Sequence, residues 1–120
     1  MSALTEIFGE PISSYSRAQA IEDGVLVDVH GTEGAKLFKP RAAITSALHE
    51  ALNVGAGKQP ATYAARLWDV FYMLSVAGRK AGSDVTFRVK VGRRMLTLSG
   101  NIGPGDDAAP VLTVGFPEDF

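Results

Sequence analysis

Two small groups of side chains in this sequence have types and spacings suited to chemistry. Asp28 and His30 stand two positions apart on a predicted strand, so they share one face, where a carboxylate beside an imidazole can act as an acid/base pair. Asp106 and Asp107 end the predicted loop Gly103-Pro-Gly-Asp-Asp107, where carboxylates could hold a hard cation. A structural interpretation competes with both, because strands become polar where they leave the core and Gly, Pro and Asp are the ordinary residues of turns.

A small enzyme or ligand-binding domain built on these four residues is therefore one hypothesis. Its side chains can meet only if the last strand lies near the first, which brings the loop beside His30. Adjacent aspartates alone make a poor cage, since divalent cations of this kind take about six or more oxygen ligands. The sequence contains no Walker loop, nucleophile elbow, zinc-protease helix motif or dinucleotide fingerprint. We assign no catalytic residue, cofactor or metal site.

Three further charged residues are candidates for contacts with an anion or a partner rather than for catalysis. Arg17 directly follows the predicted start of a helix, where the helix dipole disfavours a cation. It therefore either contacts a partner or forms a stabilising pair with a carboxylate such as Asp28 or Asp69. Arg66 and Asp69 stand three positions apart on a predicted helix and are expected to pair with each other.

Aromatic and basic residues suggest two kinds of surface. Trp68 and Tyr72 lie one helical turn apart and form either a base-stacking shelf or, more commonly, part of a core or interface. A local basic patch supports a nucleic-acid-binding accessory protein as a third hypothesis. The same cations also fit the polar alternation of an outer sheet face. They are Arg88, Lys90, Arg93 and Arg94.

Composition narrows the class of protein. A chain of 120 residues with 46% hydrophobic residues can form one core that is stable without disulfide or metal cross-links. The net charge of −1 excludes a protein that coats a phosphate backbone, or imitates DNA, by bulk charge. The absence of cysteine excludes disulfides, thiol nucleophiles and cysteine zinc sites. The imidazoles are His30 and His49, and we expect His49 to be exposed or to act as a cap.

The sequence carries no membrane or export signal that we recognise. No apolar run approaches the roughly 20 residues that a membrane helix needs. The first residues lack the basic and apolar blocks of a signal peptide. We therefore expect no membrane association and a cytoplasmic location.

Capping and periodicity predict the elements that position these side chains. Ser16 and Gln19 match the capping-box pattern at a helix start, Gly24 ends that helix, and residues 25–29 form a strand. Pro40 suits the first turn of a second helix. The apolar stripe of the second helix comprises Ile44, Ala47, Leu48, Ala51 and Leu52.

The third predicted helix is the longest, from Pro60 or Thr62 to about Arg79. Apolar residues occupy most of its circumference, so we expect it to be covered on more than one side. Its main stripe comprises Tyr63, Leu67, Val70, Phe71 and Leu74, and a second set comprises Ala64, Trp68, Tyr72 and Val76.

Strands follow in the C-terminal third. A two-residue turn at Gly92-Arg93 pairs Val89 with Leu96 and Phe87 with Leu98. A last strand covers 110–116, after a loop over 103–109. The chain is thus predicted to be a single α+β domain over 1–120, with a roughly four-stranded antiparallel or mixed sheet and three helices packed mainly on one face.

Residues 1–15 are predicted to form an N-terminal arm. Leu4, Ile7 and Phe8 stand at helical spacing, and Gly9 is the expected stop of a short amphipathic turn.

Four segments together resemble a family of small plasmid- and phage-associated proteins of unknown function. The resemblance covers most of the chain from Ile7 onward and carries over no catalytic residue. It implies a mobile-element setting, in which small cysteine-free proteins frequently inhibit host defence by binding to it. The segments are residues 15–29, Arg66-Leu-Trp-Asp-Val70, Gly103-Pro-Gly-Asp-Asp107 and residues 110–119.

The leading hypothesis is a non-enzymatic accessory protein of a mobile element that acts by binding proteins. It is expected to inhibit a bacterial defence complex, of the anti-CRISPR or anti-restriction type. The missing enzyme motifs and the surplus apolar surface of the third helix support it. Because an uncovered Trp68/Tyr72 surface would favour aggregation, we expect either a docked partner there or a homodimer through the helices.

Overall fold

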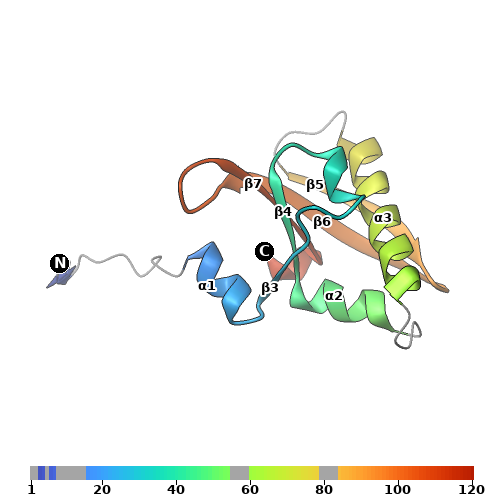
Figure 1. Ribbon diagram of the computed structural model, residues 1–120, viewed down its shortest axis with the longest axis horizontal. Helices are drawn as coiled ribbons and strands as arrows, with labels where there is room; N and C mark the ends of the chain where they lie inside the picture. The colour runs from blue at the N-terminus through green and yellow to red at the C-terminus, as the bar shows by residue number, and fades with distance from the viewer. Residues whose placement is uncertain (1–2, 5, 8–15, 55–59, 79–83) are drawn as a thin grey trace.

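A five-stranded mixed sheet forms the centre of the molecule (Figure 1). The structure, a computed structural model, describes residues 3–4, 6–7, 16–54, 60–78 and 84–120. The strands in spatial order are β3 (Leu26–Asp28), β4 (Arg41–Thr45), β7 (Pro110–Gly115), β6 (Arg94–Pro104) and β5 (Asp84–Val91). Strands β4 and β7 run parallel, and the other neighbours are antiparallel. The α+β class is confirmed, whereas the sheet has five strands instead of four.

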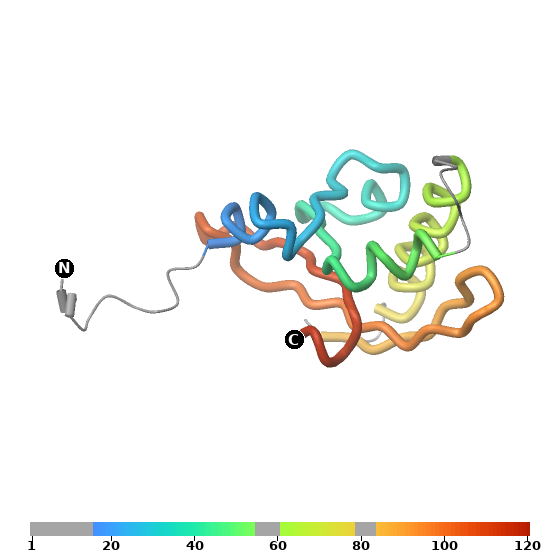
Figure 2. The backbone as a smooth tube through the Cα atoms, turned by 90° about the horizontal axis from the view of Figure 1, so that it is seen from below, coloured from blue at the N-terminus to red at the C-terminus, as the bar shows by residue number. Residues whose placement is uncertain are grey.

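Three α-helices accompany the sheet: α1 (Arg17–Glu22), α2 (Ser46–Asn53) and α3 (Pro60–Ala77). Two short 3-10 turns, η2 (Ala35–Leu37) and η4 (Pro117–Asp119), complete this part of the fold. Figure 2 shows α2 and α3 on one side of strands β5 and β6. None of the described helices combines the length and apolar character needed to cross a membrane.

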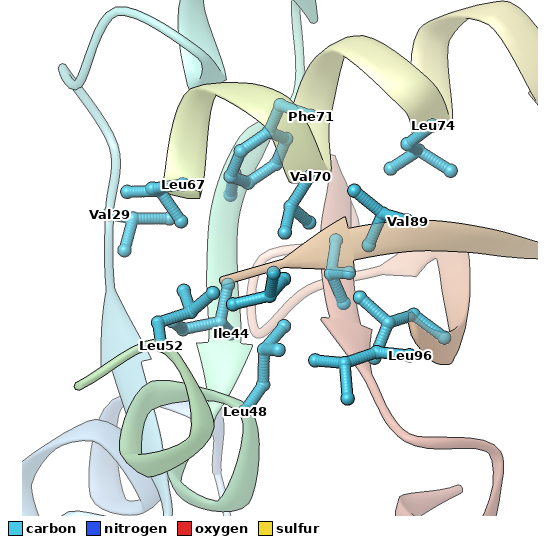
Figure 3. Packing of buried hydrophobic residues seen from close by; sticks show 14 of the residues in the cluster. Val29, Ile44, Leu48, Leu52, Leu67, Val70, Phe71, Leu74, Val89 and Leu96 are labelled. Atoms are coloured by element: carbon cyan, nitrogen blue, oxygen red, sulfur yellow. The ribbon is translucent and has the colours of Figure 1, made fainter. Parts of the chain in front are cut away.

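The face of the sheet toward α2 and α3 carries the main core. Side chains alternate along each strand, so Ile44, Leu112 and Val114 point to this face together with Val89 and Leu96. Figure 3 shows the strand residues Ile44, Val89 and Leu96 packed with residues from both helices. The core contributed by the helices comprises Leu48, Ala51, Leu52, Leu67, Val70, Phe71 and Leu74.

Helix α1 is associated with the opposite face of the sheet. Thr113 alternates with the core residues Leu112 and Val114 and therefore points away from the main core. Arg17 of α1 donates a hydrogen bond to the Thr113 hydroxyl. The expectation of three helices mainly on one face is therefore wrong for α1. A six-residue helix has little apolar surface to bury, so a polar contact can set its place.

The start and end of α1 agree with the prediction. Ser16 Oγ accepts from the Gln19 amide, and the Gln19 side chain accepts from the Ser16 amide, which completes the capping box. Gly24 has φ +81°, a left-handed conformation that ends the helix at low cost only for glycine.

The second helix is shorter than predicted, because the segment after Pro40 is strand β4. Residues Ala42, Ala43, Ile44 and Thr45 are all buried, since β4 lies between β3 and β7 and is covered on both faces. A strand buried on both faces loses the alternating pattern and can be mistaken for a helix. The Thr45 hydroxyl then accepts from the Leu48 amide and starts α2.

The C-terminal strands have the predicted register. Val89 pairs with Leu96 and Phe87 with Leu98, and Gly92 in the turn has φ +61°. Strand β6 continues to Pro104, so the predicted loop is shorter and covers 105–109. The added β6 residues are held by pairing with β7, a long-range contact that turn-forming residue types do not reveal.

The predicted helical turn in the N-terminal arm is wrong for the residues that the structure describes. Leu4 and Ile7 belong to two-residue strands, β1 (Ala3–Leu4) and β2 (Glu6–Ile7), which pair with each other. Phe8 and Gly9 lie outside the described residues, as does Arg79, the expected end of α3. A single helical turn has too few hydrogen bonds to offset the cost of nucleation.

Candidate protein-binding surface

The side of α3 that faces solvent is apolar along the length of the helix. We call it the α3 outer face and define it by its exposed residues. Helical geometry places these residues on one side, opposite the buried Leu67, Val70, Phe71 and Leu74. Apart from Asp69, all are uncharged. The α3 outer face comprises Ala61, Ala64, Ala65, Trp68, Asp69, Tyr72, Met73 and Val76.

Trp68 and Tyr72 form the largest apolar part of this face. Their rings stack with centroids 6.2 Å apart and an interplanar angle of 24°. Trp68 is 40% exposed, Tyr72 49% and Val76 42%, so a substantial part of each of these apolar residues faces solvent. The sheet, η2 and α2 all contact α3, so the expectation that α3 is covered on more than one side is met for part of its circumference, whereas the side with Trp68 and Tyr72 stays partly exposed.

Arg66 does not form the expected pair with Asp69. Its Nη1 atom donates to the carbonyl oxygens of Leu52 at 3.0 Å and Val54 at 2.6 Å instead. These carbonyls belong to the C-terminal end of α2, where a cation is favoured by the helix dipole. Asp69 is thereby left exposed, and no ion pair joins it to another described residue.

His49 also joins α2 to α3, so it is half-buried rather than exposed. Its Nδ1 atom lies 2.6 Å from the Tyr63 hydroxyl, and the two rings meet edge to face. Burial raises the pKa of Tyr63, so this hydroxyl is protonated at neutral pH. The contact joins the two helices and gives the Tyr63 hydroxyl a hydrogen-bond partner within the chain.

Arg17 is bound within the fold by two hydrogen bonds to β7. Nη1 donates to Thr113 Oγ1 at 2.6 Å, and Nη2 donates to the Leu112 carbonyl at 2.8 Å. Burial lowers the pKa of Arg17, while the negative charges of Asp28 and Asp106 act in the opposite direction. The expected carboxylate partner Asp28 is therefore close enough to act on Arg17 electrostatically. The direct hydrogen-bond acceptors lie in β7.

Asp28 forms an ion pair with a residue that the sequence did not single out. Its Oδ2 atom accepts from Arg41 Nη2 at 2.9 Å, and its Oδ1 atom accepts from the His30 amide at 3.0 Å. Burial raises the pKa of Asp28, but the hydrogen bonds from His30 and Arg41 outweigh it and lower the pKa below its ordinary value. Both carboxylate oxygens therefore have partners inside the chain.

The loop carboxylates also have structural partners. Asp106 accepts from the backbone amides of Arg17 at 2.8 Å and Ala18 at 3.1 Å, so it satisfies the first two donors of α1. Asp107 accepts from the amide of Ala109 in its own loop, at 3.2 Å. Within the described part of the chain, no three His, Asp or Glu side chains cluster closely enough to hold a metal ion.

The four residues of the predicted basic patch lie in two places. Arg88 and Lys90 alternate with the buried Val89 and point to the outer face of β5. Arg94 pairs with Val91 in the sheet register and shares its face, toward the end of α2. Arg93 stands at the turn between the two strands. The patch is therefore not one continuous basic surface.

The contacts that sequence reasoning missed join residues far apart in the chain. Arg41 pairs with Asp28, and Thr113 and Leu112 receive Arg17. A strand over 41–45 would have placed Arg41 on the Asp28 face, so the signal was hidden by the helix prediction there. Nothing local marks Leu112 or Thr113 as acceptors.

No family model, curated protein or solved structure to which this chain was compared matches it.

Proposed function

We propose that this protein acts without catalysis, by binding another protein through the α3 outer face. One observation carries the proposal: an 18-residue helix has an apolar side on which the stacked aromatic pair Trp68 and Tyr72 stays 40% and 49% exposed. Contiguous exposed apolar surface of this kind marks interaction sites, and Trp and Tyr are enriched among the residues that dominate binding energy.

The chemistry of the face defines the partner. Asp69 is its one charged residue among those described, and Arg66 is directed to the α2 carbonyls. A complementary surface is therefore apolar and presents a single cation or N–H donor to Asp69. A symmetric antiparallel pair of α3 helices would centre between Trp68 and Asp69 and bring two Asp69 carboxylates near the axis. That repulsion favours a different protein over a second copy.

The proposed partner is a bacterial defence complex, of the CRISPR or restriction type, which this protein inhibits by binding to it. The resemblance of residues 15–29 and three shorter segments to plasmid- and phage-associated proteins supports this choice of partner. The hydrogen bonds that Asp28, Asp106 and Asp107 accept within the chain give these carboxylates structural roles, which weighs against the alternative of an enzyme built on them and His30. Binding is thus favoured over chemistry for this fold.

A defence-interference assay tests the proposal. Phage plaques are counted on cells that each carry one active CRISPR or restriction system, with and without the expressed protein. The intact chain should restore plaques for at least one system, and the double variant Trp68→Ser/Tyr72→Ser should abolish that protection. The same defence complex, purified, should bind the intact protein and fail to bind the double variant.

The matched control is Met95→Ser, which removes an apolar side chain that is 54% exposed on the outer face of the sheet. It should protect like the intact chain. Failure of the intact protein in every system would reject defence inhibition. A homodimer in light scattering that the double variant dissociates would reject a different protein as the occupant of the α3 outer face.

A further inference from the structure

A cavity of about 290 Å³ lies between the end of α2, the side of α3 and the β5–β6 turn. Its floor is apolar and its rim carries three arginines, and none of the described residues that line it is acidic. The cavity is separate from the α3 outer face and from the charged residues around Arg17. It is lined by Ala51, Val54, Arg66, Val91, Gly92, Arg93 and Arg94.

Arg66 is held in a fixed orientation at this cavity. Its Nη1 atom is engaged by the Leu52 and Val54 carbonyls, which leaves Nη2 on the side of the turn. A Cβ atom on Gly92 would lie 3.0 Å from Nη2, so the turn lies directly beside this guanidinium. The positive φ of Gly92, +61°, is also suited to glycine.

Arg93 and Arg94 bring two further guanidinium groups, and no ion pair joins either of them to another described residue. Both are exposed, and between described residues the ion pairs are Lys36–Glu33 and Arg41–Asp28, which lie elsewhere. Arg94 shares the sheet face of Val91 and so borders the apolar floor. Guanidinium groups present planar arrays of donors that match the oxygens of phosphate, often with two bonds at once.

We infer that this cavity binds the phosphate group of a small phosphorylated molecule. Three positive charges and no described acidic neighbour favour a doubly charged oxyanion over a carboxylate. The volume lies at the lower end of small-molecule pockets, roughly 300 to 1,000 Å³, which suits a compact ligand. A nucleic-acid backbone fits less well, because Arg88 and Lys90 point to the other face of the sheet and do not extend the site.

Calorimetry and thermal melting with inorganic phosphate, pyrophosphate and a mononucleotide test this site. Sodium chloride at equal ionic strength is the reference for non-specific screening. Phosphate and the mononucleotide should raise the melting temperature above this reference and shift the amide NMR signals of Gly92, Arg93 and Arg94. The variant Arg94→Gln should weaken binding by about tenfold, the worth of one charge-assisted hydrogen bond.

Arg88→Gln is the matched control, since it removes the same charge from the other face of the same hairpin. It should leave the affinity unchanged. Equal weakening by both variants, or no stabilisation beyond sodium chloride, would overturn the inference. Tight binding of a single-stranded oligonucleotide that depends on Arg88 as much as on Arg94 would assign the arginines to a nucleic-acid surface and would also overturn it.

Discussion

Helices α1 and α3 differ in the kind of contact that their side chains make. Helix α1 has six residues, and the polar groups at its start are matched inside the chain. Asp106 and Ser16 accept from amides of its first turn, and Arg17 reaches β7. Helix α3 has 18 residues and is apolar on its buried side and on its exposed side.

The difference lies in what holds each helix in place. A helix of six residues is marginal by itself, so α1 depends on contacts such as Arg17 with Thr113 to persist. Helix α3 is already anchored by the residues that face the sheet, among them Phe71 and Leu74. Trp68 and Tyr72 are exposed to 40% and 49% and lie outside this buried set, which is why we propose a partner for them.

The two sides of α3 should respond to truncation very differently. Phe71→Ala removes a fully buried ring and should lower the free energy of unfolding by about 3–5 kcal/mol. Tyr72→Ala, the next residue, should change it by less than about 1 kcal/mol, because the Tyr72 side chain is half exposed. Urea denaturation of both variants measures the difference, and only Tyr72→Ala should lose binding while the fold is retained.

A large destabilisation by Tyr72→Ala would contradict this division. It would mean that the Trp68–Tyr72 stack supports the fold rather than a partner. Trp68→Phe serves as a conservative companion, since it keeps an aromatic ring over Tyr72 and should preserve both stability and binding.

Local signals in the sequence predicted the parts of the fold that depend on neighbouring residues. The Ser16 capping box and the pairing of Val89 with Leu96 are set by residues a few positions apart, and both are confirmed. Strand β4 depends on its place between β3 and β7, which no local pattern records. Its small and apolar residues, such as Ala42 and Ala43, fit a helix equally well in isolation.

The same limit applies to the candidate site. Periodicity identified α3 as apolar around most of its circumference, but only the position of the sheet shows that Trp68 and Tyr72 remain exposed. The acceptors of Arg17 lie 95 and 96 positions away in the chain. A sequence pattern can select Arg17, and the fold is needed to find what it contacts.

Removal of the Arg17 side chain should have the next largest effect on stability. Arg17→Ala loses two hydrogen bonds from a charged donor and the attraction of its charge to Asp28 and Asp106, so the free energy of unfolding should fall by about 2 kcal/mol. Thermal and urea denaturation check this. Arg88→Ala, on the outer face of the sheet, should stay within about 0.5 kcal/mol of the intact chain.

An unchanged melting temperature for Arg17→Ala, together with lost partner binding, would move Arg17 from the structural to the functional class. Arg17→Lys sharpens the test. It keeps the positive charge near Asp28 but not the forked donors that reach Thr113 and Leu112, so its stability should lie between those of the intact chain and Arg17→Ala.

The smallest expected effect concerns acid sensitivity at the β3 edge. Because the folded chain lowers the pKa of Asp28 below its ordinary value of about 3.9, the ionised carboxylate stabilises the fold above that pH. The contribution disappears as the pH falls from about 5 toward the lower folded-state pKa. Asp28→Asn should therefore lose less stability than the intact chain between pH 7 and pH 3, measured by urea denaturation at each pH. Asp69→Asn, which alters an exposed carboxylate on the α3 outer face, should follow the intact chain. The opposite result, in which Asp69→Asn flattens the pH dependence and Asp28→Asn does not, would contradict this prediction. It would mean that the contacts of Asp28 do not stabilise the fold and that an exposed carboxylate of α3 does, against the contrast drawn between the two regions.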